Sequence, residues 1–132
     1  MKKKKILIIV IVVVVSLFAI LAIGMYAITR DLSYMRDVEL RGIDLSTIDD
    51  GSYTGSFEHG RFTNTLTVRI ENGEIVRVDI DSDVTGAGVL NAADEVFSKV
   101  IDAQDTKIDA VTEATATTNA YLLAIENALN AD

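Results

Sequence analysis

The stretch NTLTVRIENGEIVRVDID, residues 64–81, decides how the chain folds. Apolar and polar residues alternate on both sides of a central Glu-Asn-Gly, which is typical of two strands joined by a tight turn. The alternating apolar residues are Leu66, Val68 and Ile70 before the turn, and Val76, Val78 and Ile80 after it. We therefore predict a β-hairpin with strands over residues 64–70 and 74–81.

The length of the turn decides which residues face each other across the hairpin. A two-residue Asn-Gly turn would pair Val68 with Arg77 and put the two apolar sets on opposite faces. A three-residue loop over residues 71–73, with Gly73 in a left-handed bulge, pairs Val68 with Val76 and puts both sets on one face. We therefore expect the three-residue loop.

The segments on either side of the hairpin complete a small domain. DGSYTGSF, residues 50–57, alternates in the same way and predicts another strand. Beyond the hairpin, apolar residues recur at spacings of three and four, which predicts an amphipathic helix. They are Val89, Ala92, Ala93, Val96, Phe97, Val100 and Ile101.

A second helix with the same spacing ends the chain. Its apolar residues are Tyr121, Ala124, Ile125, Ala128 and Leu129. Thr117, Thr118 or Asn119 is the expected N-cap. Three strands followed by two helices predict an α+β fold, a small antiparallel sheet with the helices packed on one face.

Composition excludes several classes of active site. The chain has 132 residues, enough for one small domain, and no cysteine, so disulfides and thiolate chemistry are excluded. Its single histidine, His59, rules out a metal site built on several imidazoles. We expect His59 to be a solvated loop residue, and we expect no catalytic residues and no metal ligands.

A long apolar run near the N-terminus predicts a membrane anchor. Residues 6–28 are nearly all apolar, and a helix of 23 residues spans a hydrocarbon core of roughly 30 Å. A cleaved signal peptide is the alternative, but its apolar region is typically only about 7–15 residues long. The predicted parts are a basic tail (1–5), a transmembrane helix (6–28), a connector (29–48) whose helical start ends at Gly42, and a domain (49–132).

Charge predicts the orientation of this anchor. Lys2, Lys3, Lys4 and Lys5 precede the span and should stay in the cytoplasm, so the C-terminal domain should be extracytoplasmic. Residues 31–132 carry seven basic against twenty acidic residues, a net charge of −13. Such a domain repels phosphates of nucleic acid, and we expect no nucleic-acid partner.

A cluster of small hydroxyl residues precedes the last helix. DAVTEATATTNA, residues 109–120, contains Thr112, Thr115, Thr117 and Thr118 among alanines. Free backbone N–H groups and the helix dipole favour a phosphate at such a position. Threonine is also an ordinary N-cap, so the residues alone leave a phosphate site and a simple cap as alternatives.

The chain resembles the bacterial FMN-binding domain family in DGSYTGSF, in NTLTVRIENGEIVRVDI, and in VIDAQDTKIDAVTEATATTNAYLLAIENAL. This family is similar to the covalent-FMN subunits of the sodium-pumping quinone reductase and the Rnf complex. Its motif, Asp-x-x-Ser/Thr-Gly-Ala-Thr, falls on Asp109, Thr112, Glu113, Ala114 and Thr115. The resemblance implies that Thr115 carries FMN through its phosphate, with Asp109, Thr112, Ala114, Thr117 and Thr118 around the cofactor.

The resemblance also implies a function and partners. It implies an electron carrier of the cell membrane rather than a self-contained catalyst, placed between a membrane electron donor and an external acceptor. A flavin transferase using FAD and magnesium would attach the cofactor. Glu113 stands where the family has glycine, and its negative charge opposes a phosphate. A flavin-free binding or scaffold module, and a reversible FMN binder, therefore stay open as alternatives.

Overall fold

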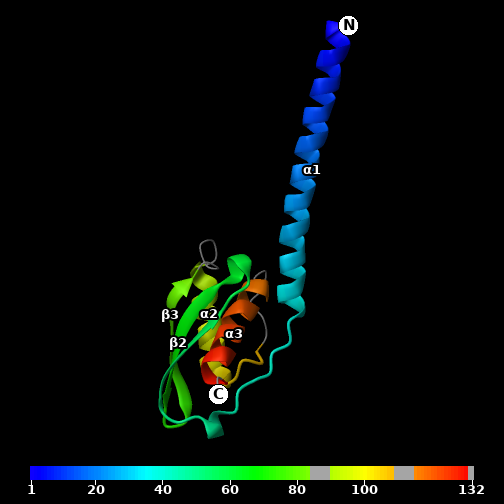
Figure 1. Ribbon diagram of the computed structural model, residues 1–132. Helices are drawn as coiled ribbons and strands as arrows, with labels where there is room; N and C mark the ends of the chain where they lie inside the picture. Colours follow the sequence, from blue (N-terminus) through cyan, green and yellow to red (C-terminus); the bar gives the residue numbers. More distant parts are fainter. Residues whose placement is uncertain (84–89, 109–114, 131–132) are drawn as a thin grey trace. The chain divides into compact units, whose positions relative to one another are not determined.

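The computed structural model describes residues 1–83, 90–108 and 115–130 of the chain. Its elements in order are α1 (Lys2–Asp37), β1 (Gly51–Phe57), β2 (Asn64–Glu71), β3 (Glu74–Asp83), α2 (Leu90–Ala103) and α3 (Thr115–Leu129), drawn in Figure 1. Short 3₁₀ helices cover Leu45–Thr47 and Gly60–Phe62. The chain divides into two compact units, Met1–Ser33 and Tyr34–Asp132.

The first unit contains the basic tail and the apolar part of α1. Its side chains are exposed along the whole predicted span, and the helix is long and apolar enough to cross a membrane once. The hydroxyl of Ser16 donates to the carbonyl of Val12 at 2.8 Å, and that of Thr29 donates to Met25 at 2.8 Å. These two hydroxyls are satisfied within the helix, as an apolar surrounding requires.

The second unit is built on an antiparallel sheet in the order β1-β2-β3. The central strand, β2, alternates strictly, and the residues that it buries are Asn64, Leu66, Val68 and Ile70. This alternation arises because successive side chains of a strand point to opposite faces. The predicted strands are confirmed, with β2 and β3 each somewhat longer than expected.

The predicted register of the hairpin is wrong. Asn72 and Gly73 form a two-residue turn, with φ of 54° and 76°, and Glu71 pairs with Glu74. Positive φ at both central residues is what a type I′ turn requires, and this turn matches the twist of the strands. The turn therefore has two residues, where we expected three.

A β-bulge resolves the conflict between this turn and the apolar pattern. Ile70 pairs with Ile75, but Arg69 pairs with Arg77, so Val76 is the extra residue. Val76 is 42% exposed, whereas Val78 pairs with Val68 and is buried. An inserted residue shifts the alternation by one position, which brings both strands to the same core face.

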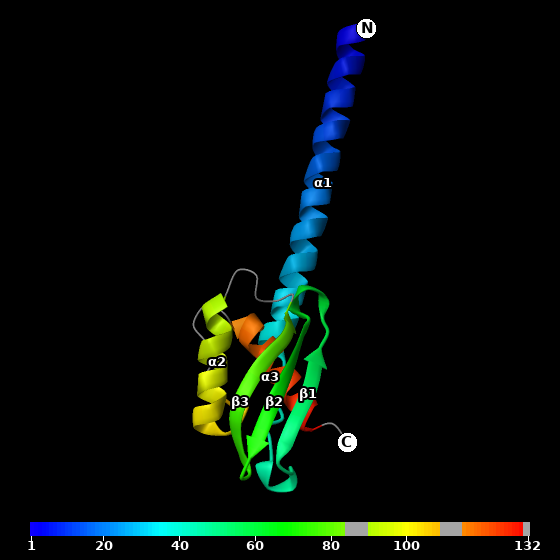
Figure 2. The same cartoon turned by 90° about the vertical axis from the view of Figure 1, so that its left-hand side faces the viewer.

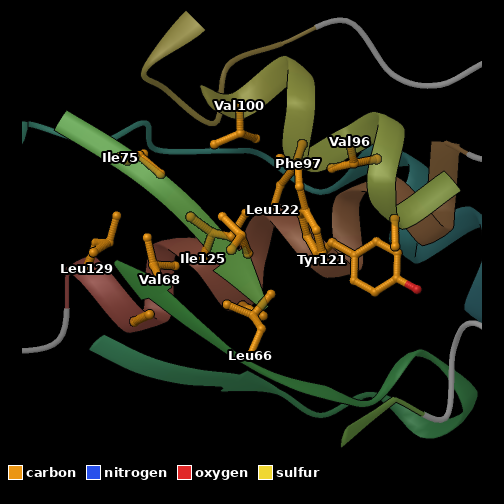
Figure 3. Close-up of a cluster of buried hydrophobic side chains, with 14 of the residues drawn as sticks. Leu66, Val68, Ile75, Val96, Phe97, Val100, Tyr121, Leu122, Ile125 and Leu129 are labelled. Atoms are coloured by element: carbon orange, nitrogen blue, oxygen red, sulfur yellow. The ribbon is translucent and has the colours of Figure 1, made fainter. Parts of the chain in front are cut away.

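Both helices of this unit cover one face of the sheet. Helix α3 packs on β1 and β2, and α2 packs on β3 and α3; Figure 2 shows α3 behind the sheet and α2 beside β3. The described core residues of α2 are Ala93, Val96, Phe97 and Val100, and those predicted for α3 are all buried. Figure 3 shows the larger of these side chains, among them Val96, Phe97 and Ile125, gathered against the strand residues Leu66 and Val68. The α+β fold is confirmed.

Gly55 allows α3 to lie directly on β1. A Cβ added at Gly55 would lie 2.6 Å from the Cα of Ala128 and nearer still to the Ala128 nitrogen and the Ala124 oxygen. No side-chain movement can relieve an overlap with backbone. The helix can approach the strand this closely only because position 55 has no side chain.

The connector is fastened to the far end of α3. Helix α1 ends at Asp37 rather than continuing to Gly42, so the predicted helix stop is wrong. Gly42 instead donates its N–H to Oε1 of Glu126 at 2.9 Å, and its carbonyl accepts from Asn130 at 3.2 Å. Glu126 is fully buried and also accepts from the Thr106 hydroxyl at 2.7 Å. This carboxylate holds the connector against the domain.

Candidate functional site

The candidate site lies at the N-terminal end of α3. The helix begins at Thr115, before the residues predicted to cap it, so that prediction is wrong. The predicted caps are used otherwise: the Asn119 side chain donates to the carbonyl of Met35 at 2.7 Å, and Thr118 is fully buried. The threonine cluster therefore runs into the helix instead of only preceding it.

Thr115 is the first residue of this helix and is half-buried. An α-helix leaves its first four N–H groups without partners inside the helix, and its dipole makes this end partly positive. A hydroxyl on the first residue thus lies where an anion is stabilised. A phosphate joined to Thr115 would meet these N–H groups.

The structure separates the other predicted site residues. Thr118 lies three positions after Thr115 and therefore on the same side of the helix. Thr117 lies two positions after Thr115, on a different side. Asp109, Thr112 and Ala114, and also Glu113, lie outside the described residues.

Two buried polar atoms near this helix end have no hydrogen-bond partner among the described residues. Asn64, at the start of β2, donates its Nδ2 to the carbonyl of Ala120 at 3.2 Å, while its Oδ1 makes no hydrogen bond within the described parts of the chain. The buried hydroxyl of Thr118 makes none there either. Buried polar atoms are nearly always hydrogen-bonded, so the pair fits a place that receives a polar group. The alternation of the strand predicts that Asn64 lies on the core face, but nothing in the sequence indicates that its side chain has a free acceptor for a polar ligand.

A further bond ties the end of β3 to α3. The hydroxyl of Tyr121, which is fully buried, donates to Oδ2 of Asp83 at 2.6 Å. Burial raises the pKa of Tyr121 above its usual range, and the hydrogen bond to Asp83 and the charge of that carboxylate raise it further. The pair holds the end of β3 beside the second turn of α3. The sequence placed Tyr121 in the core but gave no sign of its partner.

An aromatic stack lies next to this region. The rings of Tyr34 and His59 are 4.6 Å apart and nearly parallel, at 25°, and Phe57 lies 6.4 Å from His59. His59 lies in a loop, as predicted, but it is half-buried and stacked on Tyr34 rather than fully solvated. The stack was not predicted because Tyr34 comes from the end of α1, far away in the sequence.

Comparison with known families agrees with this geometry. The model of the FMN-binding domain family matches residues 59–130, which include β2, β3, α2 and the whole of α3. No curated protein matches the chain. The phosphate of FMN suits a helix N-terminus that carries a hydroxyl, and the buried Thr118 and Asn64 atoms suit a polar ligand. Since the match covers more than half of its residues, the chain belongs to the FMN-binding domain family.

Proposed function

We propose that the chain is a single-pass membrane protein that carries FMN covalently on Thr115, outside the cytoplasm, and relays electrons. The observation that carries this proposal is that Thr115 is the first residue of α3 and lies inside the segment that matches the family. The helix end stabilises the phosphate, and the threonine hydroxyl supplies the atom that is modified.

Attachment transfers the FMN part of FAD to the hydroxyl of Thr115. The Thr115 Oγ attacks the flavin-side phosphorus of FAD on a flavin transferase. A new oxygen–phosphorus bond forms as the pyrophosphate bond breaks, AMP leaves, and the hydroxyl proton passes to a base of the transferase. Thr115 is half-buried, so part of its surface is open to the transferase.

Once attached, FMN supplies the redox chemistry, and the protein supplies position and electrostatics. The N–H groups of the first turn of α3 would hold the phosphate. Asn119 holds the neighbouring Met35 backbone, and Tyr121 holds the end of β3 through Asp83. Electrons pass between a membrane donor and an external acceptor. A covalent tether keeps the cofactor on a domain that is open to the exterior.

The anchor and its orientation rest on α1 and its flanking charges. The helix is long and apolar enough for one crossing, and four lysines precede its apolar part. The positive-inside bias favours a cytoplasmic N-terminus. Residues after about Arg30 are then extracytoplasmic.

One feature of the sequence favours a second candidate function. Glu113 stands two positions before Thr115 in the sequence, where the family pattern has glycine, and its negative charge opposes a phosphate. If that charge prevents attachment, the domain is a flavin-free binding or scaffold module, or it binds FMN reversibly. Glu113→Gly removes the charge and separates these candidates from the leading one.

The experiment compares the full chain with its Glu113→Gly variant, each co-expressed with a flavin transferase. The proposal predicts yellow protein whose flavin survives denaturation and shows fluorescence in a denaturing gel, with more label in Glu113→Gly. Flavin released on denaturation indicates reversible binding. A colourless parent beside a labelled Glu113→Gly variant indicates a flavin-free descendant and contradicts the proposal.

A further inference from the structure

Tyr34 presents an aromatic ring that is only partly covered. It is the first residue of the second unit, and its ring stacks on His59 at 4.6 Å. The residue is nevertheless 53% exposed. One side of the ring is thus packed against the domain, and a large part of its surface is free for another flat group.

A hydrogen bond joins the residue after Tyr34 to the N-terminal half of α3. The Asn119 side chain is buried and donates to the carbonyl of Met35, the residue next to Tyr34. Asn119 lies one helical turn after Thr115, and side chains four positions apart on a helix lie on the same face, roughly 5–6 Å apart at their Cβ atoms. Met35 is itself fully buried, so this contact is part of the packed domain.

His59, on which the Tyr34 ring stacks, is also linked to the N-terminal half of α3. Phe57, two residues before His59, pairs with Asn64 across β1 and β2. Asn64 in turn donates to the carbonyl of Ala120 in α3. Two independent chain segments therefore bring the Tyr34–His59 stack to the beginning of α3.

We propose that Tyr34 contacts the isoalloxazine ring of FMN and forms one wall of its site. The inference rests on the proposed attachment to Thr115. The ribityl chain separates the flavin ring from the phosphate, so a ring-binding residue lies within the length of that chain from the attachment point. Flat aromatic groups pack favourably against one another in offset or edge-to-face arrangements.

This contact gives the end of α1 a role in cofactor binding. Tyr34 directly follows, in the sequence, the unit that contains the apolar span. Two other roles are conceivable for an exposed tyrosine here: an anchor at the membrane interface, or a cover for His59. Neither of them involves the flavin.

The test measures flavin fluorescence in the full-length protein, co-expressed with a flavin transferase and purified in detergent. Tyrosine in contact with a flavin quenches its fluorescence, and phenylalanine does so far less because it is harder to oxidise. Tyr34→Phe keeps the ring that covers His59 but removes the phenol. Tyr26→Phe is the matched control, because Tyr26 lies in the same helix and is also exposed.

We expect a severalfold higher fluorescence yield per bound flavin in Tyr34→Phe, with unchanged labelling, and the parent yield in Tyr26→Phe. Hydroxyl-radical footprinting should also show Tyr34 more protected in the labelled parent than in unlabelled Thr115→Ala, with Tyr53 equally reactive in both.

Three results would overturn the inference. A fully labelled Tyr34→Phe variant with the parent yield shows that the flavin does not contact Tyr34. A folded Tyr34→Phe variant that is never labelled assigns the residue to attachment and not to ring contact. A parent that carries no FMN refutes the proposed function, and this inference with it.

Discussion

At the scale of single residues, the buried Tyr121 hydroxyl makes the stability of the domain sensitive to alkaline pH. Burial and Asp83 raise the pKa of Tyr121 in the folded state, whereas an unfolded tyrosine ionises near pH 10. Above that pH the unfolded state releases the proton and the folded state keeps it, so the free energy of unfolding falls as pH rises. This stabilisation is fully present below the unfolded pKa.

We therefore expect the melting temperature of the parent to fall more steeply above about pH 10 than that of Tyr121→Phe. Thermal unfolding at a series of pH values checks this difference. All other titrating groups are shared by the two proteins. Parallel curves through this range would show that the ionisation of Tyr121 is not coupled to folding.

Single residues also show what could be predicted of the site. The motif singles out Thr115 from the sequence, and the structure places it at the start of a helix. The burial of Thr118 and the bond from Asn119 to Met35 could not be predicted, because their surroundings come from segments distant in the sequence. Local sequence patterns point to candidate site residues, but they do not show which residues from distant segments contact them.

At the scale of elements, the hairpin depends on the backbone of Gly73. Its φ is +76°, and a Cβ there would meet no atom within 4 Å, so any cost of substitution comes from the backbone alone. We expect Gly73→Val to lower the free energy of unfolding by roughly 1 kcal/mol or more, because β-branched residues resist this region. Gly73→Asn, which tolerates positive φ, should cost less. Equal stability of the parent and both variants, measured by denaturant unfolding, would refute this requirement.

The packing of α3 on β1 depends on Gly55. Gly55→Ala puts a methyl group into the backbone of α3 and should destabilise the domain by about 1–3 kcal/mol or more. Gly24→Ala is the matched control, because a Cβ at Gly24 meets nothing within 4 Å. Thermal melts of the two variants test the contact. A Gly55→Ala domain that melts like the control would mean that the helix does not lie this close to the strand.

The elements themselves were predictable where the sequence is periodic. The alternation in β2 and the apolar spacing in α3 follow directly from strand and helix geometry, and both predictions are confirmed. The register of β3 could not be predicted. A bulge at Val76 changes which residues pair across the two strands, and the alternation of apolar and polar residues in the sequence does not reveal it. The start of α3 was missed because threonine and asparagine are favoured as caps, and here tertiary contacts use them inside the helix.

At the scale of the whole molecule, charge is divided along the chain. Four lysines precede the apolar helix, and the residues after position 30 carry a net charge of −13. We expect protease added to intact protoplasts to remove the C-terminal domain while leaving an N-terminal tag intact. A domain that stays protected until the membrane is dissolved would show the opposite orientation.

The central claim is that FMN is joined to Thr115. The most direct measurement is the intact mass of the full chain and of Thr115→Ala, Thr115→Ser and Thr117→Ala, each co-expressed with a flavin transferase. We predict that the parent gains the mass of one FMN less one water. Thr115→Ala should gain none and keep its melting temperature, because losing a partly exposed hydroxyl costs little stability. Thr115→Ser and Thr117→Ala should still gain it, at least in part. A parent without added mass, or a Thr115→Ala variant that carries the full addition, would contradict the account.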